Sequence, residues 1–277
     1  MKFLQTIQNS IYSPKFYSDI HKKSFKESIV YFLLLSLILT VITTIPLIQP
    51  ILAEVPMQIQ GFLSRVKDCF PVELEVKVLN GQISTNTTEP YFISPCGSSN
   101  SQKIAVIDTK NTFSPEKFAE YKVYVWITKN SVVYKKDNYE TRTYNVDKIK
   151  DFKLNKSVLN SYYNQFTPWI KFIGPILLIV SFTGIFLSYS LRLIYLLLIA
   201  SLIWLLGKLF KQLLTFAPSY KLSLHAVTLG LIVELVLGLL RPWIQFQGFP
   251  FMVSILTLGV VTLNLFLPKN GQNPQKT

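Results

Sequence analysis

The chain has 277 residues, of which 49% are hydrophobic and only 16% are charged. Soluble domains average about 25% charged residues, so this composition argues against an ordinary soluble protein. The formal net charge is +13, but no basic helix or known nucleic-acid-binding motif accompanies it, and we expect no nucleic-acid partner. Basic residues that face the anionic headgroups of a lipid bilayer account better for this excess.

Five apolar runs have the length needed to cross the hydrocarbon core of a bilayer, which is roughly 30 Å thick. They cover residues 28–51, 169–191, 193–210, 222–240 and 249–267. We therefore predict an α-helical polytopic membrane protein with about five transmembrane helices and an inserted extracytoplasmic α+β domain. The predicted parts are a cytoplasmic N-terminal segment (1–27), a first transmembrane helix (28–51), the α+β domain (52–166), a four-helix transmembrane region (167–268) and a C-terminal tail (269–277).

The N-terminal segment is rich in lysine just before the first apolar run. Lysines cluster between residues 15 and 26, so the positive-inside rule places the N-terminus in the cytoplasm and residues 52–166 outside it. The first run lacks a small-residue cleavage site, and we expect it to be retained, unlike a signal peptide. Further lysines between residues 208 and 221 fall in a loop that this topology places outside. They conflict with the rule, and the side on which this loop lies stays open.

The start of the chain has the spacing of one apolar helical stripe, which Pro14 then interrupts. The spacing predicts a short helix on the cytoplasmic membrane surface, with a disordered tail as the alternative. The stripe consists of Phe3, Leu4, Ile7 and Ile11.

Residues 52–166 have the patterning of a small folded domain. The stretch LEVKVLNGQIST alternates apolar and polar residues before Asn80-Gly81, which supply the positive φ values of a type I′ turn, and so predicts a β-hairpin. Ser114 and Pro115 suit the N-cap and the first position of a helical turn. Residues 145–163 have a helical or irregular pattern. Further stretches predict strands of a small antiparallel sheet, namely KIAVID, YKVYVWIT, VVYKKD and YETRTYNV.

The only two cysteines, Cys69 and Cys96, both lie in this domain. Outside the cytoplasm two cysteines are expected to form a disulfide, which would stabilise the domain by roughly 3 kcal/mol because it restricts the unfolded chain. Two buried free thiols are the alternative. The chain has only two histidines and no C-x-x-C motif, so we expect no metal site.

The stretch YKVYVWIT places Tyr124 and Trp126 on one side of a predicted strand. Exposed aromatic rings stack on sugars or peptides, which makes both residues candidates for contact with a ligand. Aromatic side chains more often pack under a helix or the membrane surface. We favour the packing interpretation over the ligand-binding one.

The fourth apolar run contains a single carboxylate, Glu234. On a helix, Ala226, Gly230, Glu234 and Gly238 follow one another at i+4 spacing, and small residues at this spacing allow close helix–helix packing. Glu234 is therefore predicted to face another helix. It is either an ionisable site for a proton or cation or a structural hydrogen-bond partner worth on the order of 1 kcal/mol. We favour the structural role, because no further ionisable group is predicted at membrane depth.

Known catalytic motifs are missing from the sequence. The chain has no G-x-S-x-G, H-E-x-x-H, G-x-G-x-x-G or P-loop pattern. The outer domain contains no histidine, which excludes a Ser-His-Asp triad there. We predict no catalytic residues, no cofactor and no enzymatic activity.

A resemblance to known proteins is carried by the stretches SIYSPKFYSDIHKKSFKESIVYFLLLSLI, FPVELEVKVLNGQIS, IAVIDT and VWITKNSVVYKK. They resemble a bacterial family of multi-pass membrane proteins of unknown function, whose members are sometimes labelled maltodextrin-utilisation proteins. That family is distantly similar to the five-span Yip membrane-trafficking superfamily. The resemblance implies a bacterial cytoplasmic membrane location and no catalytic residues.

Two functions fit these observations. The first is a non-enzymatic role in binding, sensing or scaffolding through the outer domain and the helix bundle, with the bilayer and other membrane proteins as partners. The alternative is a component of a carbohydrate or proton-coupled transport system, with Glu234 as its intramembrane ionisable site. The ligand of the outer domain does not follow from the sequence.

Overall fold

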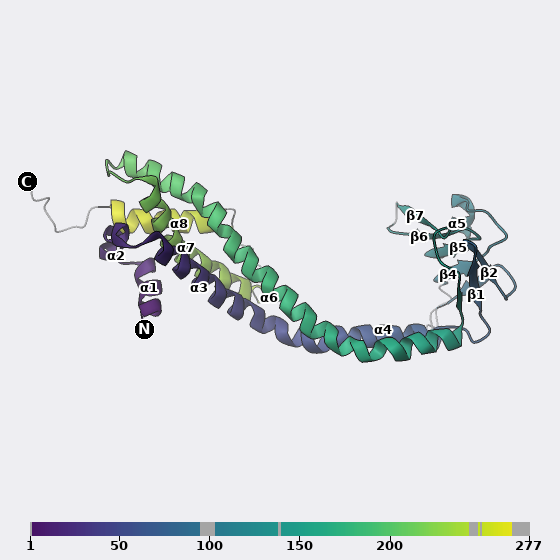
Figure 1. The fold of residues 1–277 in the computed structure, drawn as a ribbon. Coiled ribbons are helices and arrows are strands. Elements are labelled where there is room, and N and C mark those ends of the chain that lie inside the picture. Colours follow the sequence, from purple (N-terminus) through teal and green to yellow (C-terminus); the bar gives the residue numbers. More distant parts are fainter. Residues whose placement is uncertain (1, 95–102, 138–139, 244–248, 250, 268–277) are drawn as a thin grey trace, which may run out of the picture. The chain divides into compact units, whose positions relative to one another are not determined.

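The computed structural model describes residues 2–94, 103–137, 140–243, 249 and 251–267. The chain forms two compact units, one made of residues 1–50 and 176–277 and the other of residues 51–175. We call the first the helical unit and the second the α/β unit. One long helix, α6 (Lys156–Leu209), contributes residues to both (Figure 1).

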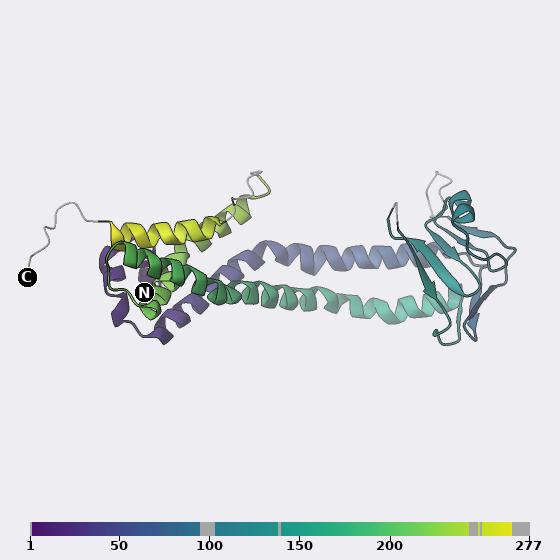
Figure 2. The same ribbon diagram turned by 90° about the horizontal axis from the view of Figure 1, so that it is seen from above.

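The helical unit begins with short helices and continues with long apolar ones (Figure 2). Its first helix covers the stripe of apolar residues at the start of the chain, so the helix predicted there is confirmed. The elements of this unit, besides the C-terminal part of α6, are α1 (Lys2–Ile11), α2 (Pro14–Ser18), η1 (Ile20–Lys22), α3 (Phe25–Thr44), η2 (Ile45–Leu47), α7 (Phe216–Leu240), α8 (Met252–Val261) and η4 (Thr262–Phe266).

Helix α3 begins at a side-chain cap and ends at a proline. The Ser24 hydroxyl accepts a hydrogen bond of 3.1 Å from the backbone N–H of Glu27. Glu27 lies three residues after the cap, where its negative charge also favours the positive end of the helix dipole. At the other end Pro46 cannot donate a backbone hydrogen bond, and the chain continues as the 3₁₀ turn η2.

The structure has fewer membrane-length helices than the five predicted. Among the described residues, three helical segments are long and apolar enough to cross a membrane, namely Phe25–Leu47, Lys156–Leu209 and Phe216–Leu240. The apolar runs 169–191 and 193–210, predicted as separate spans, lie on the one helix α6. Arg192 alone interrupts them, and because arginine is a good helix former the helix continues through it. The last run contains only the shorter apolar helix Met252–Phe266.

The core of the helical unit is formed by side chains from α2, α3, α6, α7 and the C-terminal helices. Each long helix contributes residues about one turn apart, as expected for a helix that buries one face. The most buried of them are Tyr17, Phe32, Leu35, Leu196, Ile203, Leu222, Leu224 and Leu231.

The α/β unit contains two sheets, a short helix and a helical pair. Helix α4 and the start of α6 run antiparallel, and a Cβ atom on Gly174 would lie only 2.9 Å from the Ile51 carbonyl oxygen, so glycine permits their approach. The elements before α6 are η3 (Pro50–Glu54), α4 (Val55–Cys69), β1 (Val76–Leu79), β2 (Gln82–Thr85), β3 (Tyr91–Ile93), β4 (Ala105–Ile107), α5 (Pro115–Tyr121), β5 (Val125–Ile127), β6 (Ser131–Lys135), β7 (Thr141–Asn145) and β8 (Phe152–Leu154).

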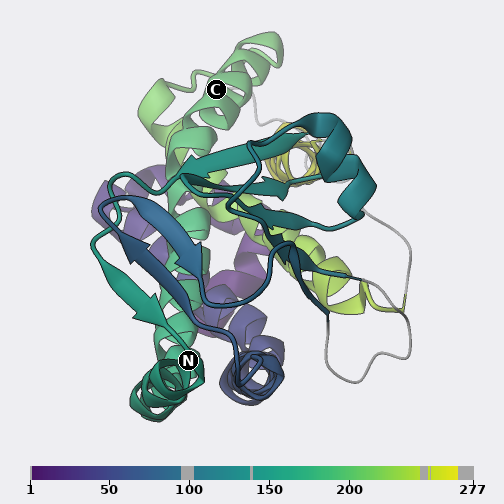
Figure 3. The same cartoon turned by 90° about the vertical axis from the view of Figure 1, so that its right-hand side faces the viewer.

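The strands form a three-stranded sheet in the order β2-β1-β8 and a five-stranded sheet in the order β3-β4-β5-β6-β7 (Figure 3). The hairpin predicted around Asn80-Gly81 is confirmed, because β1 pairs antiparallel with β2 and both turn residues have positive φ, 51° and 71°. The predicted cap of α5 is also confirmed, since the Ser114 hydroxyl accepts from the Lys117 N–H at 3.2 Å.

Three details of this domain were not predicted from the sequence. Strands β4 and β5, joined by α5, pair in parallel, whereas the other strand pairs of the described residues are antiparallel, as expected for a domain dominated by a small antiparallel sheet. The strand predicted over YKVYVWIT is only Val125–Ile127, because α5 extends to Tyr121 and Lys122 ends it in the left-handed conformation. Strand β8 lies within residues 145–163, where the sequence indicated helical or irregular structure.

Two cores hold the α/β unit together. The first lies between the two sheets and includes Leu74, Val78 and Ile107. The second lies between the five-stranded sheet and α5, where Phe118 of the helix packs against Trp126. The five-stranded sheet is therefore covered on both faces, and this arrangement decides which aromatic side chains stay exposed.

Candidate functional site

The carboxylate of Glu234 on α7 is paired with Arg192 on α6. Two guanidinium nitrogens donate to its two oxygens, Nη1 to Oε2 at 2.5 Å and Nη2 to Oε1 at 2.8 Å. This is the bidentate geometry in which arginine holds a carboxylate most firmly. The side chains are only partly exposed, 24% for Arg192 and 39% for Glu234. The pair therefore connects two long apolar helices.

Arg192 was not predicted as the partner of Glu234. Arg192 lay between the predicted spans 169–191 and 193–210, and no further ionisable group was expected at the depth of Glu234. The continuous helix α6 instead places Arg192 in the middle of an apolar helix, where an unpaired charge is costly. A single base and a single acid, each inside its own long apolar run, were the signal that could have identified the pair.

Beside the ion pair is an open pocket of about 420 Å³. The Tyr195 hydroxyl, at its edge, contacts the Ser254 hydroxyl of α8. Charge, hydroxyl and aromatic groups thus meet at one place between apolar helices. This suits either a structural clasp, that is, an ion pair that holds the helices together, or the binding of a small polar molecule. The lining residues are Arg192, Tyr195, Glu234, Phe249, Phe251, Met252 and Val253.

The four residues predicted to pack against another helix have different surroundings in the structure. They are Ala226, Gly230, Glu234 and Gly238. Ala226 is fully buried, and a Cβ atom on Gly230 would lie 3.0 Å from Val253 Cγ1 and 3.2 Å from its Cα, so α7 and α8 pack closely there. Glu234 instead meets α6. A Cβ atom on Gly238 would have no described neighbour within 4 Å, so Gly238 takes no part in a close contact.

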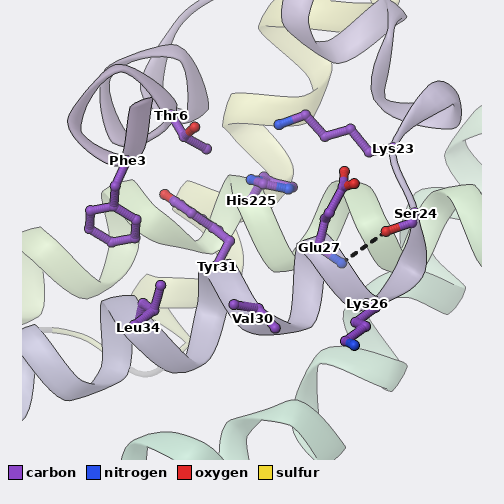
Figure 4. Close-up of a pocket in the computed structure, with 10 residues that line it drawn as sticks. All are labelled: Phe3, Thr6, Lys23, Ser24, Lys26, Glu27, Val30, Tyr31, Leu34 and His225. Atoms are coloured by element: carbon purple, nitrogen blue, oxygen red, sulfur yellow. Dashed lines mark hydrogen bonds between the residues drawn. The ribbon is translucent and has the colours of Figure 1, made fainter. Parts of the chain in front are cut away.

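A second pocket of the helical unit, of about 470 Å³, lies at the N-terminal end of α3 (Figure 4). Its wall includes His225 of α7, which is 1% exposed. The His225 ring stacks on Tyr31 with a centroid separation of 4.4 Å and meets Phe16 edge-on at 5.1 Å. Its Nδ1 lies 3.3 Å from the Ser10 hydroxyl, whereas its Nε2 has no hydrogen-bond partner among the described residues.

In the α/β unit, the side chains of Trp126 and Tyr124 differ sharply in their exposure to solvent. Trp126 is 0% exposed, packs against Phe118 and donates through its indole N–H to the Asp108 carbonyl at 3.3 Å. It is a core residue, so the suggestion that it faces a ligand is wrong and the packing interpretation holds. Tyr124 is 52% exposed. Of the two side chains, only that of Tyr124 is exposed at the surface.

The acidic groups of this unit have structural partners. Burial raises the pKa of Asp108, but hydrogen bonds from the Tyr121 hydroxyl, at 2.6 Å, and from Asn111 outweigh it, so the net pKa is lowered. Glu75 lies within salt-bridge distance of Lys153 and Lys77, at 2.6 and 3.1 Å, and these contacts lower its pKa to about 2. Among the described residues no group of three His, Cys, Asp or Glu side chains has the arrangement of a metal site.

The predicted disulfide would join Cys69 to Cys96. Cys69 is the last residue of α4, whereas Cys96 lies outside the described residues. The bridge between them therefore stays a prediction.

The long apolar helices, the paired charges between two of them and the small α/β unit define a helical protein with membrane-span-like segments. Residues 4–265 match the sequence model of a family described as protein of unknown function (DUF1189), and the chain belongs to that family. Comparisons with curated proteins and with solved structures gave no match.

Proposed function

We propose that this protein is a non-enzymatic, multi-pass protein of the bacterial cytoplasmic membrane that acts by binding, sensing or scaffolding. The observation that supports membrane insertion is the surface of the helical unit. Large apolar side chains are exposed along α3 and α6 on a scale that a water-soluble surface rarely shows, whereas a bilayer would cover them. They include Val30, Leu34, Leu37, Ile38, Val41, Ile176, Ile179, Val180, Leu187, Leu191, Ile194 and Leu198.

In the proposed orientation the N-terminus is cytoplasmic and the strands of the α/β unit are outside, as the lysines before α3 favour. Protease added to intact cells should then cleave within the α/β unit, and a thiol reagent that cannot cross lipid should label Cys69 after reduction. Protection from both reagents until the membrane is opened would mean that the orientation is inverted. Recovery of the protein in the soluble fraction would refute membrane insertion itself.

The α/β unit is the proposed binding part, and its exposed Tyr124 supports this. The resemblance to proteins labelled as maltodextrin-utilisation proteins makes oligosaccharides the first ligand class to test, followed by cell-wall fragments. A trafficking role of the Yip type is not part of the proposal, because the described residues contain three long apolar helices where the Yip pattern has five.

The binding role is testable by calorimetric titration of the purified full-length protein in detergent. We expect one of the two ligand classes to bind and Tyr124→Ala to weaken that binding without changing the melting temperature. Exposed Tyr144, 63% accessible, provides the matched control as Tyr144→Ala. Failure of both classes to bind, or equal effects of the two substitutions, would contradict a ligand site at Tyr124.

A second candidate function is favoured by the pocket beside Arg192 and Glu234. Opposite charges that line a pocket between apolar helices are suited to bind a polar substrate or a proton in a transport cycle. Uptake driven by a proton gradient in proteoliposomes, and lost in Glu234→Gln at unchanged melting temperature, would favour transport. Loss of stability without any uptake by the unaltered protein would favour the structural clasp.

A further inference from the structure

The pocket at the N-terminal end of α3 changes from polar to apolar along the helix. Lys23, Ser24 and Glu27 line it where the helix begins, and Val30 and Leu34 line it one to two turns further on. From the start of α3 at residue 25 to residue 34 the helix rises roughly 14 Å, at about 1.5 Å per residue. Figure 4 shows these side chains on the same side of α3, with His225 and Tyr31 beside them.

The polar end carries both signs of charge. Lys23 and Glu27 line the pocket together with His225, and Figure 4 shows the ends of both side chains on the side of the His225 ring toward the start of α3. The Lys23 ammonium lies 4.0 Å from the centre of the Phe16 ring. Among the described residues Glu27 forms no salt bridge within 4 Å. The charges of Lys23 and Glu27 interact with each other without a salt bridge between them, so a ligand that has both charges can contact each of the two groups.

The buried His225 adds a third group that needs a partner. If the Ser10 hydroxyl donates to Nδ1, the hydrogen of the neutral imidazole is on Nε2, which is then a donor. A buried donor without an acceptor is unfavourable, so such atoms call for a ligand or another explanation. The N-terminus of α3, a helix of 20 residues, adds a partial positive charge at the same end. A negatively charged group that accepts hydrogen bonds would be favourable for Lys23, for the Nε2–H of His225 and for the N-terminus of α3.

The other end of the pocket suits hydrocarbon. Val30 and Leu34 are each 45% exposed, and Phe3 closes the far side against Tyr31 at a centroid separation of 5.6 Å. Because α3 is one of the helices proposed to insert into the bilayer, this part of the pocket would face acyl chains. The gradient from charge to apolar surface matches the order of groups in a phospholipid.

We propose that this pocket binds one phospholipid with an amine-bearing headgroup of the phosphoethanolamine type. Its phosphate is held by Lys23 and by the Nε2–H of His225, its ammonium by Glu27, and its acyl chains lie over Val30 and Leu34. The inference rests on the proposed membrane insertion and adds a specific lipid partner to it. Glu27 gives the selectivity, because its negative charge disfavours a headgroup that is only anionic.

The test uses the full chain purified in detergent and measures its melting temperature during titration with short-chain lipids. The probes are phosphatidylethanolamine, phosphatidylglycerol, phosphatidylcholine and inorganic phosphate. We expect phosphatidylethanolamine to raise the melting temperature at about tenfold lower concentration than phosphatidylglycerol. Lys23→Gln should raise the required concentration of both lipids about tenfold, since one good charged contact is worth roughly a factor of ten.

Glu27→Gln is the variant that separates headgroup recognition from general lipid binding. It should abolish the preference for phosphatidylethanolamine over phosphatidylglycerol and leave the melting temperature without lipid within a few degrees. The control is Lys22→Gln, because exposed Lys22 pairs with Asp19 at 2.7 Å and does not line the pocket. It should change neither affinity nor preference.

Several results would overturn the inference. Inorganic phosphate acting as well as the lipids would mean a free-anion site, and equal action of all lipids would mean unspecific solvation of apolar surface. A Lys22→Gln effect as large as that of Lys23→Gln would place the interaction outside the pocket. A protein found in membranes without lipid preference refutes only this inference, whereas a protein found outside membranes refutes the proposed function as well.

Discussion

Breaking the ion pair between Arg192 and Glu234 should destabilise the helical unit measurably. Exposed ion pairs contribute about 0–1 kcal/mol, whereas removal of one partner from a buried pair costs about 3–5 kcal/mol. The Arg192 and Glu234 side chains are 24% and 39% exposed and joined by two hydrogen bonds. We therefore expect the free-energy cost of breaking this pair to lie between these two values. We expect Arg192→Gln and Glu234→Gln each to cost about 2 kcal/mol.

The measurement is the melting temperature of the detergent-solubilised protein. For chains of this size about 1 kcal/mol corresponds to roughly 2–4 °C, so each variant should melt about 4–8 °C lower. The variant with both substitutions should lose much less than the sum, because either change already breaks the pair. Reversal of the charges, Arg192→Glu together with Glu234→Arg, should recover at least half of the loss.

The control is Arg241→Gln, at the exposed end of α7, which should shift the melting temperature by no more than a degree or two. The reasoning would be refuted if Arg192→Gln and Glu234→Gln lowered the melting temperature no more than this control. It would also be refuted if their effects simply added in the double variant, since additivity means that the two side chains do not interact.

Three further predictions follow from the packing and the charges. Trp126→Ala should destabilise the α/β unit by about 3–5 kcal/mol in urea unfolding because it empties a fully buried site, whereas exposed Tyr124→Ala should stay within about 0.5 kcal/mol. Gly230→Leu should lower the melting temperature because its side chain would collide with α8, and Gly238→Leu, which has open space, should not; equal shifts would contradict the close packing of α7 and α8. The pKa of Glu75 is lowered to about 2 in the folded protein, from 4.5 for the free side chain, so its contribution to stability is present above about pH 4.5 and is lost as the pH falls toward 2. The difference in unfolding midpoint between the protein and Glu75→Gln should shrink over that range, and a difference that does not change with pH would show that the carboxylate is unpaired in solution.

The local features that the sequence predicted depend on neighbours along the chain. The hairpin turn at Asn80-Gly81 formed because both residues tolerate positive φ, and the cap at Ser114 formed because its hydroxyl reaches an N–H three residues later. The apolar runs likewise identified where long helices lie. Each of these patterns is set within a few residues, so a single sequence contains all the information needed.

What the sequence left undecided depends on contacts between distant residues. Pairing of β4 with β5 in parallel requires α5 to cross between them, and the sequence of neither strand identifies the strand with which it pairs. Trp126 is buried because α5 covers its face of the sheet, which alternation along one strand cannot show. Arg192 and Glu234 are 42 positions apart, so only the tertiary structure shows that the guanidinium has a carboxylate partner. Composition and local pattern thus determined the helices and the hairpin, whereas pairing across the fold determined the candidate sites.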